Sequence, residues 1–223
     1  MMRDVEPQAV IFDLDGVLIE SEQVWDEVRR GLAIGAGRPW PPETTTALQG
    51  MSTGEWSRHL VEVVGVPGSP EDVAAEVIRR VADRYRDGLP LLPGAVDTVR
   101  ALAGRWRLGV ASSSPVTLIR LVLATAGVAD LFGAAVSSEE VPHGKPAPDV
   151  YLEAAARLGA EPPRCVAVED SSNGLRAAVA AGMVLVAAPN AEYPPAADAL
   201  ALATAVVPGV AGVTPELIAS LPG

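Results

Sequence analysis

Lysine is almost absent from this chain. Of its 17 basic residues, all are arginine except Lys145. Cysteine is equally rare. The single Cys165 cannot form a disulfide within the chain, and its place in an apolar run favours a core position over a reactive thiol. Long apolar runs are also missing, since none approaches the roughly 20 residues that span a bilayer.

Positive charge is scarce overall. The 28 acidic residues outnumber the basic ones and give a net charge of −11, which argues against nucleic acid or an anionic membrane surface as a partner. The first residues include Arg3, Asp4 and Glu6 rather than the basic and apolar pattern of a secretory signal, so we expect a cytoplasmic protein. With 223 residues, 49% of them hydrophobic, the chain can form one α/β domain and a smaller insertion.

Two carboxylates follow a candidate strand near the start of the sequence. Residues Ala9–Phe12 are apolar and partly β-branched, as in a strand that is buried on both faces of a parallel sheet. Asp13 and Asp15 come next, and residues two apart on an extended backbone point to the same side. Gly16 then lets the chain turn away sharply. This geometry suits a divalent metal ion and a phosphate group.

The pattern Asp-x-Asp-Gly-Val-Leu at residues 13–18 resembles the first motif of the haloacid dehalogenase (HAD) superfamily, most of whose members are Mg²⁺-dependent phosphatases. The resemblance implies that Asp13 attacks phosphorus and carries the phosphoryl group. Asp15 would protonate the leaving oxygen and later deprotonate the attacking water. The alternative is an ordinary turn, in which aspartate is common.

Strands and helices alternate along most of the chain. Apolar residues between positions 21 and 92 recur only at helical spacing, which predicts an all-helical cap inserted after the first strand. The rest predicts an α/β fold with a doubly wound, Rossmann-like parallel sheet. The predicted domains are a catalytic core of residues 1–20 and 93–223 and a cap of residues 21–92. The expected strands are Leu108–Ala111, Ala134–Ser137, Cys165–Val168 and Val184–Ala187, and the expected core helices are Ala95–Ala103, Val116–Ala126, Pro148–Leu158 and Asn173–Ala181. The family resemblance places the first strand beside the one that ends at Val168.

Three serines follow the strand Leu108–Ala111. Ser112 matches the second HAD motif, which implies that its hydroxyl binds a phosphoryl oxygen together with backbone amides of the turn, that of Ser113 among them. Ser114 precedes a proline and a helix, and we interpret it as a helix cap.

The only lysine lies between a strand and a helix. Lys145, in Gly-Lys-Pro at residues 144–146, is similar to the third HAD motif, in which a lysine pairs with the nucleophilic carboxylate and the phosphoryl group. A compact ammonium fits between two anionic groups better than a planar guanidinium does, which explains why arginine is not used here. The alternative is a solvated surface residue.

A second buried strand, Cys165–Val168, also ends in acids. Glu169 and Asp170 resemble the fourth HAD motif, whose acids hold Mg²⁺. The predicted ligands are Asp13, the carbonyl of Asp15 and Asp170, with Glu169 bound directly or through water. Asp170 and the following serine could also cap the next helix, and both roles can hold together.

The Glu-Asp-Ser sequence and the helical cap resemble the subfamily of β-phosphoglucomutase and small sugar-phosphate phosphatases. We therefore expect a phosphatase that hydrolyses small phosphate monoesters, sugar phosphates above all, with a small phosphorylated metabolite as its partner. The sequence does not determine the oligomeric state, and a monomer is favoured. The cap loop after Leu48 resembles a loop of that subfamily that faces the active site, and it could equally be a plain helix connection. Its candidate substrate contacts are Gly50, Met51, Ser52 and Thr53.

Two other functions are open to this sequence. β-Phosphoglucomutases carry a hinge histidine and a cap arginine where this chain has Trp25 and Thr53, which favours hydrolysis over isomerisation. A non-catalytic relative would be expected to have lost one of the motif residues, and none is missing. Dehalogenases of the HAD superfamily lack an acid at the position that matches Asp15, so the resemblance disfavours dehalogenation. Phosphonate cleavage in the family needs a lysine in the cap, and residues 21–92 contain none.

Overall fold

The computed structural model describes residues 6–48, 51–190 and 194–222. Contacts divide the chain into two compact units, which we describe separately. The core unit is the chain up to Glu20 and from Pro90 onward, and the cap unit is Ser21–Leu89. Two backbone hydrogen bonds join the two segments of the core unit next to the points where the cap is inserted. The Leu92 amide donates to the Leu18 carbonyl at 3.0 Å, and the Glu20 amide donates to the Pro90 carbonyl at 2.8 Å.

The core unit contains a six-stranded parallel sheet in the order β3-β2-β1-β4-β5-β6. The predicted doubly wound α/β fold is confirmed, and β1 lies between β2 and β4, as the family resemblance implied. The strands are β1 (Ala9–Phe12), β2 (Arg107–Ser112), β3 (Phe132–Ser137), β4 (Cys165–Glu169), β5 (Val184–Ala187) and β6 (Ala205–Val206).

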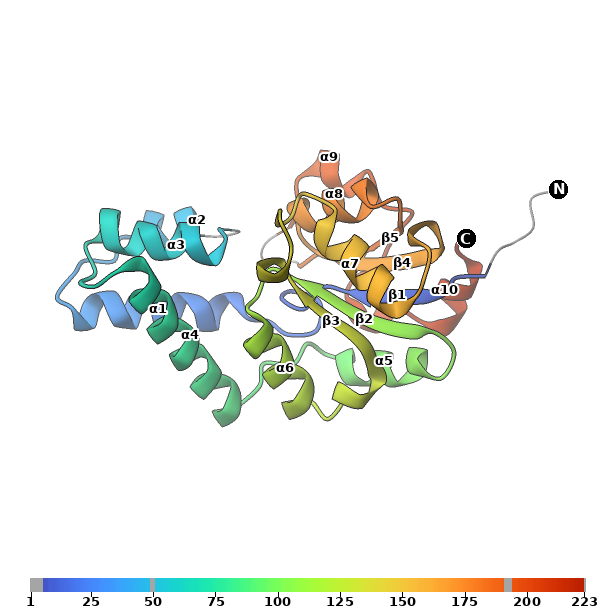
Figure 1. The fold of residues 1–223 in the computed structure, drawn as a ribbon, viewed down its shortest axis with the longest axis horizontal. Helices are drawn as coiled ribbons and strands as arrows, with labels where there is room; N and C mark the ends of the chain where they lie inside the picture. The colour runs from blue at the N-terminus through green and yellow to red at the C-terminus, as the bar shows by residue number, and fades with distance from the viewer. Residues whose placement is uncertain (1–5, 49–50, 191–193, 223) are drawn as a thin grey trace. The chain divides into compact units, whose positions relative to one another are not determined.

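Helices cover both faces of this sheet. Figure 1 shows α7 and α8 on one side of it and α5 and α6 on the other. The core helices are α5 (Ala95–Ala103), α6 (Val116–Thr125), α7 (Asp149–Leu158), α8 (Ser172–Ala180), α9 (Ala197–Leu200) and α10 (Pro215–Ser220), with 3₁₀ turns at Ala129–Leu131, Ser138–Glu140, Pro162–Arg164 and Val210–Gly212. All four β1 side chains are fully buried, and each large apolar one stabilises the fold by about 1.5–3 kcal/mol. Cys165 is buried as predicted, and burial raises the pKa of its thiol to about 11.

The parallel arrangement decides where the polar residues lie. In register, Phe12 is level with Val110 of β2 and with Val168 of β4. The residues that follow these positions therefore meet at one edge of the sheet, where parallel α/β sheets bind their ligands.

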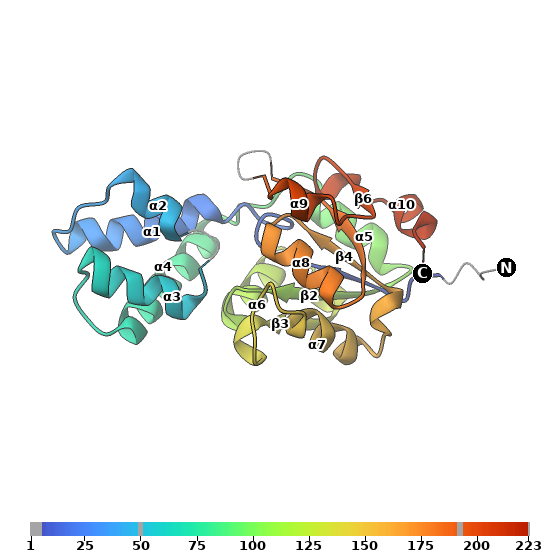
Figure 2. The ribbon, with the colours of Figure 1, turned by 90° about the horizontal axis from the view of Figure 1, so that it is seen from above.

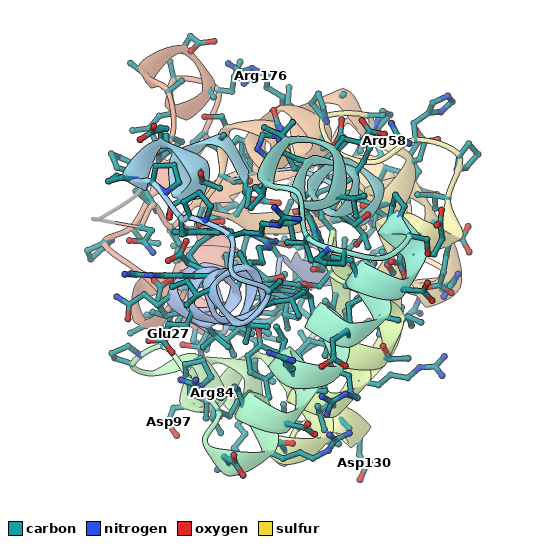
Figure 3. The ribbon with its side chains drawn as sticks, turned by 90° about the vertical axis from the view of Figure 1, so that its left-hand side faces the viewer. Glu27, Arg58, Arg84, Asp97, Asp130 and Arg176 are labelled. Carbon is teal, nitrogen blue, oxygen red and sulfur yellow. The ribbon has the colours of Figure 1, made fainter. Side chains whose placement is uncertain are left out.

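The cap unit consists of α1 (Glu22–Gly35), α2 (Pro42–Leu48), α3 (Thr53–His59), which continues into a π-helical turn at Leu60–Val64, and α4 (Pro70–Asp87). Figure 2 shows these helices gathered into one bundle. Its interior holds Trp25 and Trp56, whose ring centroids lie 5.9 Å apart, and the Arg29 guanidinium is 4.9 Å from each. On its surface, Glu27 and Arg84 pair at 2.6 Å (Figure 3), a solvated contact worth about 0–1 kcal/mol.

The sequence prediction missed the elements after Ala187. The strand β6 has two residues, α9 has four and α10 has six, so none is long enough to show a hydrophobic period. No helix within the described ranges is long and apolar enough to cross a membrane.

Candidate active site

Asp13 stands directly after β1 at the centre of the sheet. Its backbone amide donates to the Val168 carbonyl at 2.9 Å, which fixes the backbone of Asp13 against β4. The turn after it depends on Gly16, whose φ is +80°. A Cβ atom at Gly16 would lie 2.0 Å from Oδ2 of Asp170, so only glycine lets the first loop come this close to the second acidic segment.

Lys145 joins the two acidic segments. Its ammonium lies 2.8 Å from Oδ1 of Asp13 and 2.5 Å from Oε1 of Glu169, and only 5% of its side chain is exposed. Burial alone would lower the pKa of this lysine, but the two carboxylates outweigh burial and raise it above its usual range. Lys145 is therefore a buried, charged residue of the site rather than a solvated one.

Asp13, Glu169 and Asp170 form a buried carboxylate cluster. One oxygen from each lies within 4.8 Å of the others, a spacing that could hold a metal ion. Burial, opposed by Lys145, raises the pKa of Asp13 to about 7, and burial also raises that of Asp170 well above its usual value. Oδ1 of Asp170 is buried and has no hydrogen-bond partner among the described residues. Oxygen ligands that carry excess negative charge are what a hard divalent cation requires.

The Asp15 side chain contacts two serines at the end of β2 and in the turn after it. Its Oδ2 accepts hydrogen bonds from the hydroxyls of Ser114 at 2.7 Å and Ser112 at 3.3 Å. Ser112 is fully buried, and its Oγ accepts the Ser114 amide at 3.0 Å. Ser137 supports this turn, because its hydroxyl donates to the Ser114 carbonyl at 2.8 Å. This position of the carboxylate fits the predicted role of Asp15 as a proton carrier. The predicted metal ligand at Asp15 is its backbone carbonyl and not its side chain.

The helix-cap interpretation of Ser114 was wrong. Pro115 holds the N-cap position of α6, and the Ser114 side chain donates to Asp15 instead. The signal for this contact was the spacing, because Ser112 and Ser114 are two residues apart as a strand ends and can face the same partner. The Ser113 side chain is exposed, and contact of its backbone amide with a phosphate group stays a prediction.

The acids after β4 differ in their surroundings. Ser171 is the N-cap of α8, where its hydroxyl accepts the Gly174 amide at 3.1 Å, so the predicted cap lies at this residue and not at Asp170. Glu169 is completely buried and surrounded by protein donors. Asp170 therefore offers more free oxygen to a ligand than Glu169 does.

Of the four residues of the cap that were predicted to contact substrate, the structure describes three. Gly50 lies outside the described residues. The amide and the hydroxyl of Ser52 both donate to Glu55, at 2.8 and 2.7 Å, as at the start of a helix, while Met51 and Thr53 are half-buried. Contact of these residues with substrate stays a prediction.

Comparisons with known proteins agree with this geometry. The haloacid dehalogenase-like hydrolase family matches residues 7–182. Hexitol phosphatase B of Escherichia coli (strain K12) is 37% identical over 84% of this chain and 86% of its own length. Fructose-1-phosphate phosphatase YqaB of the same strain is 32% identical over 78% of this chain and 92% of its own. The crystal structure of β-phosphoglucomutase from Clostridium difficile superposes with a TM-score of 0.79 at 25% identity, covering 95% of both chains.

Fold and site together define a hydrolase with a parallel α/β core and an acidic centre at the carboxyl edge of its sheet. The chain belongs to the haloacid dehalogenase-like hydrolases. The family predicted from the four motifs is confirmed.

Proposed function

We propose that this protein is a Mg²⁺-dependent phosphatase that hydrolyses small phosphate monoesters, with sugar phosphates as its substrates. The observation that carries the proposal is the buried group of Asp13, Lys145 and Asp170 at the carboxyl edge of the sheet. Membership of a hydrolase family supports the reaction type. The names of hexitol phosphatase B and fructose-1-phosphate phosphatase, two relatives that share most of this chain, support the substrate class.

The residues present fit a magnesium ion. Asp13 and Asp170 would hold it with the Asp15 carbonyl, and the buried, unpartnered Oδ1 of Asp170 is an oxygen in need of such a partner. When bound, the ion would offset the charge of the carboxylates and of the transferring phosphoryl group.

The first half-reaction is transfer to the protein. A carboxylate oxygen of Asp13 attacks phosphorus, and the bond between phosphorus and the ester oxygen breaks. Asp15, protonated at this stage, gives its proton to that oxygen, and the alcohol leaves. Lys145 holds Asp13 in place, and with Ser112 and the Ser113 amide it stabilises charge on the phosphoryl oxygens.

The second half-reaction is hydrolysis of the aspartyl phosphate. Asp15, now a carboxylate, takes a proton from water while the water oxygen attacks phosphorus. The bond from phosphorus to Asp13 breaks, phosphate is released and Asp15 is protonated again. The two steps sum to hydrolysis of the ester to an alcohol and phosphate. Ser114 holds Oδ2 of Asp15 at 2.7 Å, which leaves the buried Oδ1 of Asp15 as the atom for proton transfer.

The test is a phosphate-release screen with Mg²⁺ over hexitol phosphates, sugar phosphates, phosphoglycolate and nucleotides. We expect release from several sugar or hexitol phosphates, and none from Asp13→Asn, which keeps the shape of the side chain but removes the nucleophile. Asp97→Asn, a change at an exposed acid of α5 (Figure 3), is the matched control and should keep full activity. Normal turnover by Asp13→Asn would refute the mechanism.

The mutase alternative has its own readout. The protein is incubated with β-glucose 1-phosphate, Mg²⁺ and a trace of glucose 1,6-bisphosphate. We expect free phosphate, and rapid accumulation of glucose 6-phosphate without free phosphate would identify an isomerase instead. The predictions of a monomer and of a cytoplasmic location stay predictions.

A further inference from the structure

Tyr151 is a buried polar residue of the site that the two half-reactions do not use. It lies in α7, its side chain is fully buried, and its hydroxyl donates to Oε1 of Glu169 at 2.9 Å. The Lys145 ammonium, which contacts the same Oε1, lies 5.1 Å from the centre of the Tyr151 ring. Tyr151 thus lies against both Glu169 and the ammonium that Glu169 holds.

Glu169 is held too completely to serve as a free ligand. Its Oε1 accepts from Lys145 and Tyr151, and its Oε2 accepts from the amides of Asp170 and Ser171 and from the Ser171 hydroxyl. A carboxylate has about four lone-pair sites, so these five donors saturate it. Gly174 makes room for it, because a Cβ atom there would lie 1.8 Å from Oε1.

The fixed Glu169 carboxylate orients the ammonium group of Lys145. A lysine ammonium sits at the end of a flexible four-carbon stem and has three N–H donors. One donor is engaged by Glu169 and one by Asp13, so the third is left for a phosphoryl oxygen. The position of that third donor depends on where Oε1 of Glu169 stands, and the Tyr151 hydroxyl is the only neutral donor to Oε1 among the described residues.

We infer that Tyr151 is a positioning residue that acts through Glu169 to aim Lys145, and that Glu169 serves as the anchor of that lysine and not as a direct metal ligand. The inference rests on the proposed phosphatase function. The phenol is not a proton carrier in this role, since it only donates a fixed hydrogen bond. Losing it frees Oε1 to move, and a small misplacement of a catalytic charge costs up to about 100-fold in rate.

The test compares Tyr151→Phe with Thr98→Val. The first variant removes only the hydroxyl and keeps the ring that packs in the core. The second removes another buried hydroxyl of the core unit, which donates to the Val210 carbonyl at 3.1 Å and lies outside the site. Both are measured for thermal unfolding, for kcat and KM of phosphate release, and for the Mg²⁺ concentration at half-maximal rate.

Because Lys145 is the only lysine, a second readout needs no activity. Protein grown on ¹⁵N,¹³C-lysine and purified without a lysine-containing tag gives one ammonium signal by NMR. In Tyr151→Phe we expect that signal to shift and its protons to exchange faster with water. In Thr98→Val the signal should stay where it is in the parent.

The expected result for Tyr151→Phe is a kcat lower by roughly 10- to 100-fold, with the KM and the Mg²⁺ requirement within about threefold of the parent. Thr98→Val should lose similar thermal stability and keep its kcat. A Tyr151→Phe kcat within twofold of the parent, an unmoved lysine signal, or a large rise in the Mg²⁺ requirement would each overturn the inference. If the parent releases no phosphate from any substrate, the proposed function fails, and the lysine signal alone then decides whether Tyr151 positions Lys145.

Discussion

Gly174 lies in the first turn of α8, where a change to alanine would ordinarily stabilise a helix by about 1 kcal/mol. In this protein we expect Gly174→Ala to lower the free energy of unfolding instead. An alanine Cβ at this position would lie 1.8–2.1 Å from the three carboxylate atoms of Glu169, far inside any real contact. A flexible carboxylate could swing away at little cost, but this one is fully buried and bonded on both oxygens, so it must move by more than about 1 Å and break hydrogen bonds.

The size of this loss of stability is set by the hydrogen bonds of Glu169 that an alanine at position 174 would break. The contacts of Glu169 with Lys145 and Tyr151 involve a charged acceptor, and such hydrogen bonds contribute about 1.5–3 kcal/mol each. Losing both, less the gain of about 1 kcal/mol in helix propensity, leaves a net loss of about 2–5 kcal/mol. For a chain of this size that corresponds to a Tm lower by roughly 4–20 °C.

Thermal unfolding followed by circular dichroism measures this change. Gly31→Ala is the matched control, because Gly31 is also helical, in α1, and nothing lies within 4 Å of the point where an alanine Cβ would stand. It should raise the stability of the cap unit by about 1 kcal/mol. A Gly174→Ala protein as stable as the parent, with unchanged kcat, would refute the placement of the Glu169 carboxylate.

Three further changes test the site. Lys145→Arg should lower kcat by at least about 100-fold despite keeping the charge, because the space between Asp13 and Glu169 fits an ammonium; a rate within a few-fold of the parent would contradict this. Asp170→Ala should raise the Mg²⁺ concentration at half-maximal rate more than about tenfold, and an unchanged requirement would place the metal elsewhere. Ser114→Ala removes a hydrogen bond to the Asp15 carboxylate of about 1.5–3 kcal/mol, so kcat should fall by roughly 10- to 100-fold with an unchanged KM; equal rates would exclude Ser114 from orienting Asp15.

Sequence reasoning succeeded where chemistry follows a strand. Asp13 and Asp170 each come at the end of an apolar run, and parallel strands bring such ends to one edge of a sheet. The resemblance to the HAD superfamily then predicted that these two strands are neighbours, and they are. Lys145 was predicted for two other reasons: it resembles the third HAD motif, and a single lysine among arginines suggested a function that arginine could not serve. Both signals lie in the sequence before any packing is known.

The contacts that orient these groups could not be predicted in this way. Ser114 meets Asp15 across 99 residues of sequence. Tyr151 meets Glu169 only because α7 packs against β1, β2 and β3, beside the strand that ends at Glu169. In the sequence, Tyr151 is one more apolar position of an amphipathic helix, and nothing in its neighbours indicates that its hydroxyl has a buried acceptor. Such pairings depend on tertiary packing that a hydrophobic period does not encode.

The burial of the only lysine also determines how this protein reacts with common reagents. The Lys145 side chain is 5% exposed and ion-paired, so no side-chain amine of the described chain is open to succinimidyl esters or to glutaraldehyde. Such reagents would fail to cross-link neighbouring copies through lysine side chains. Attachment to a surface or a dye is better directed at the carboxylates, of which the chain has 28 acidic residues to offer, or at a cysteine introduced at exposed Val63, because the native thiol is buried.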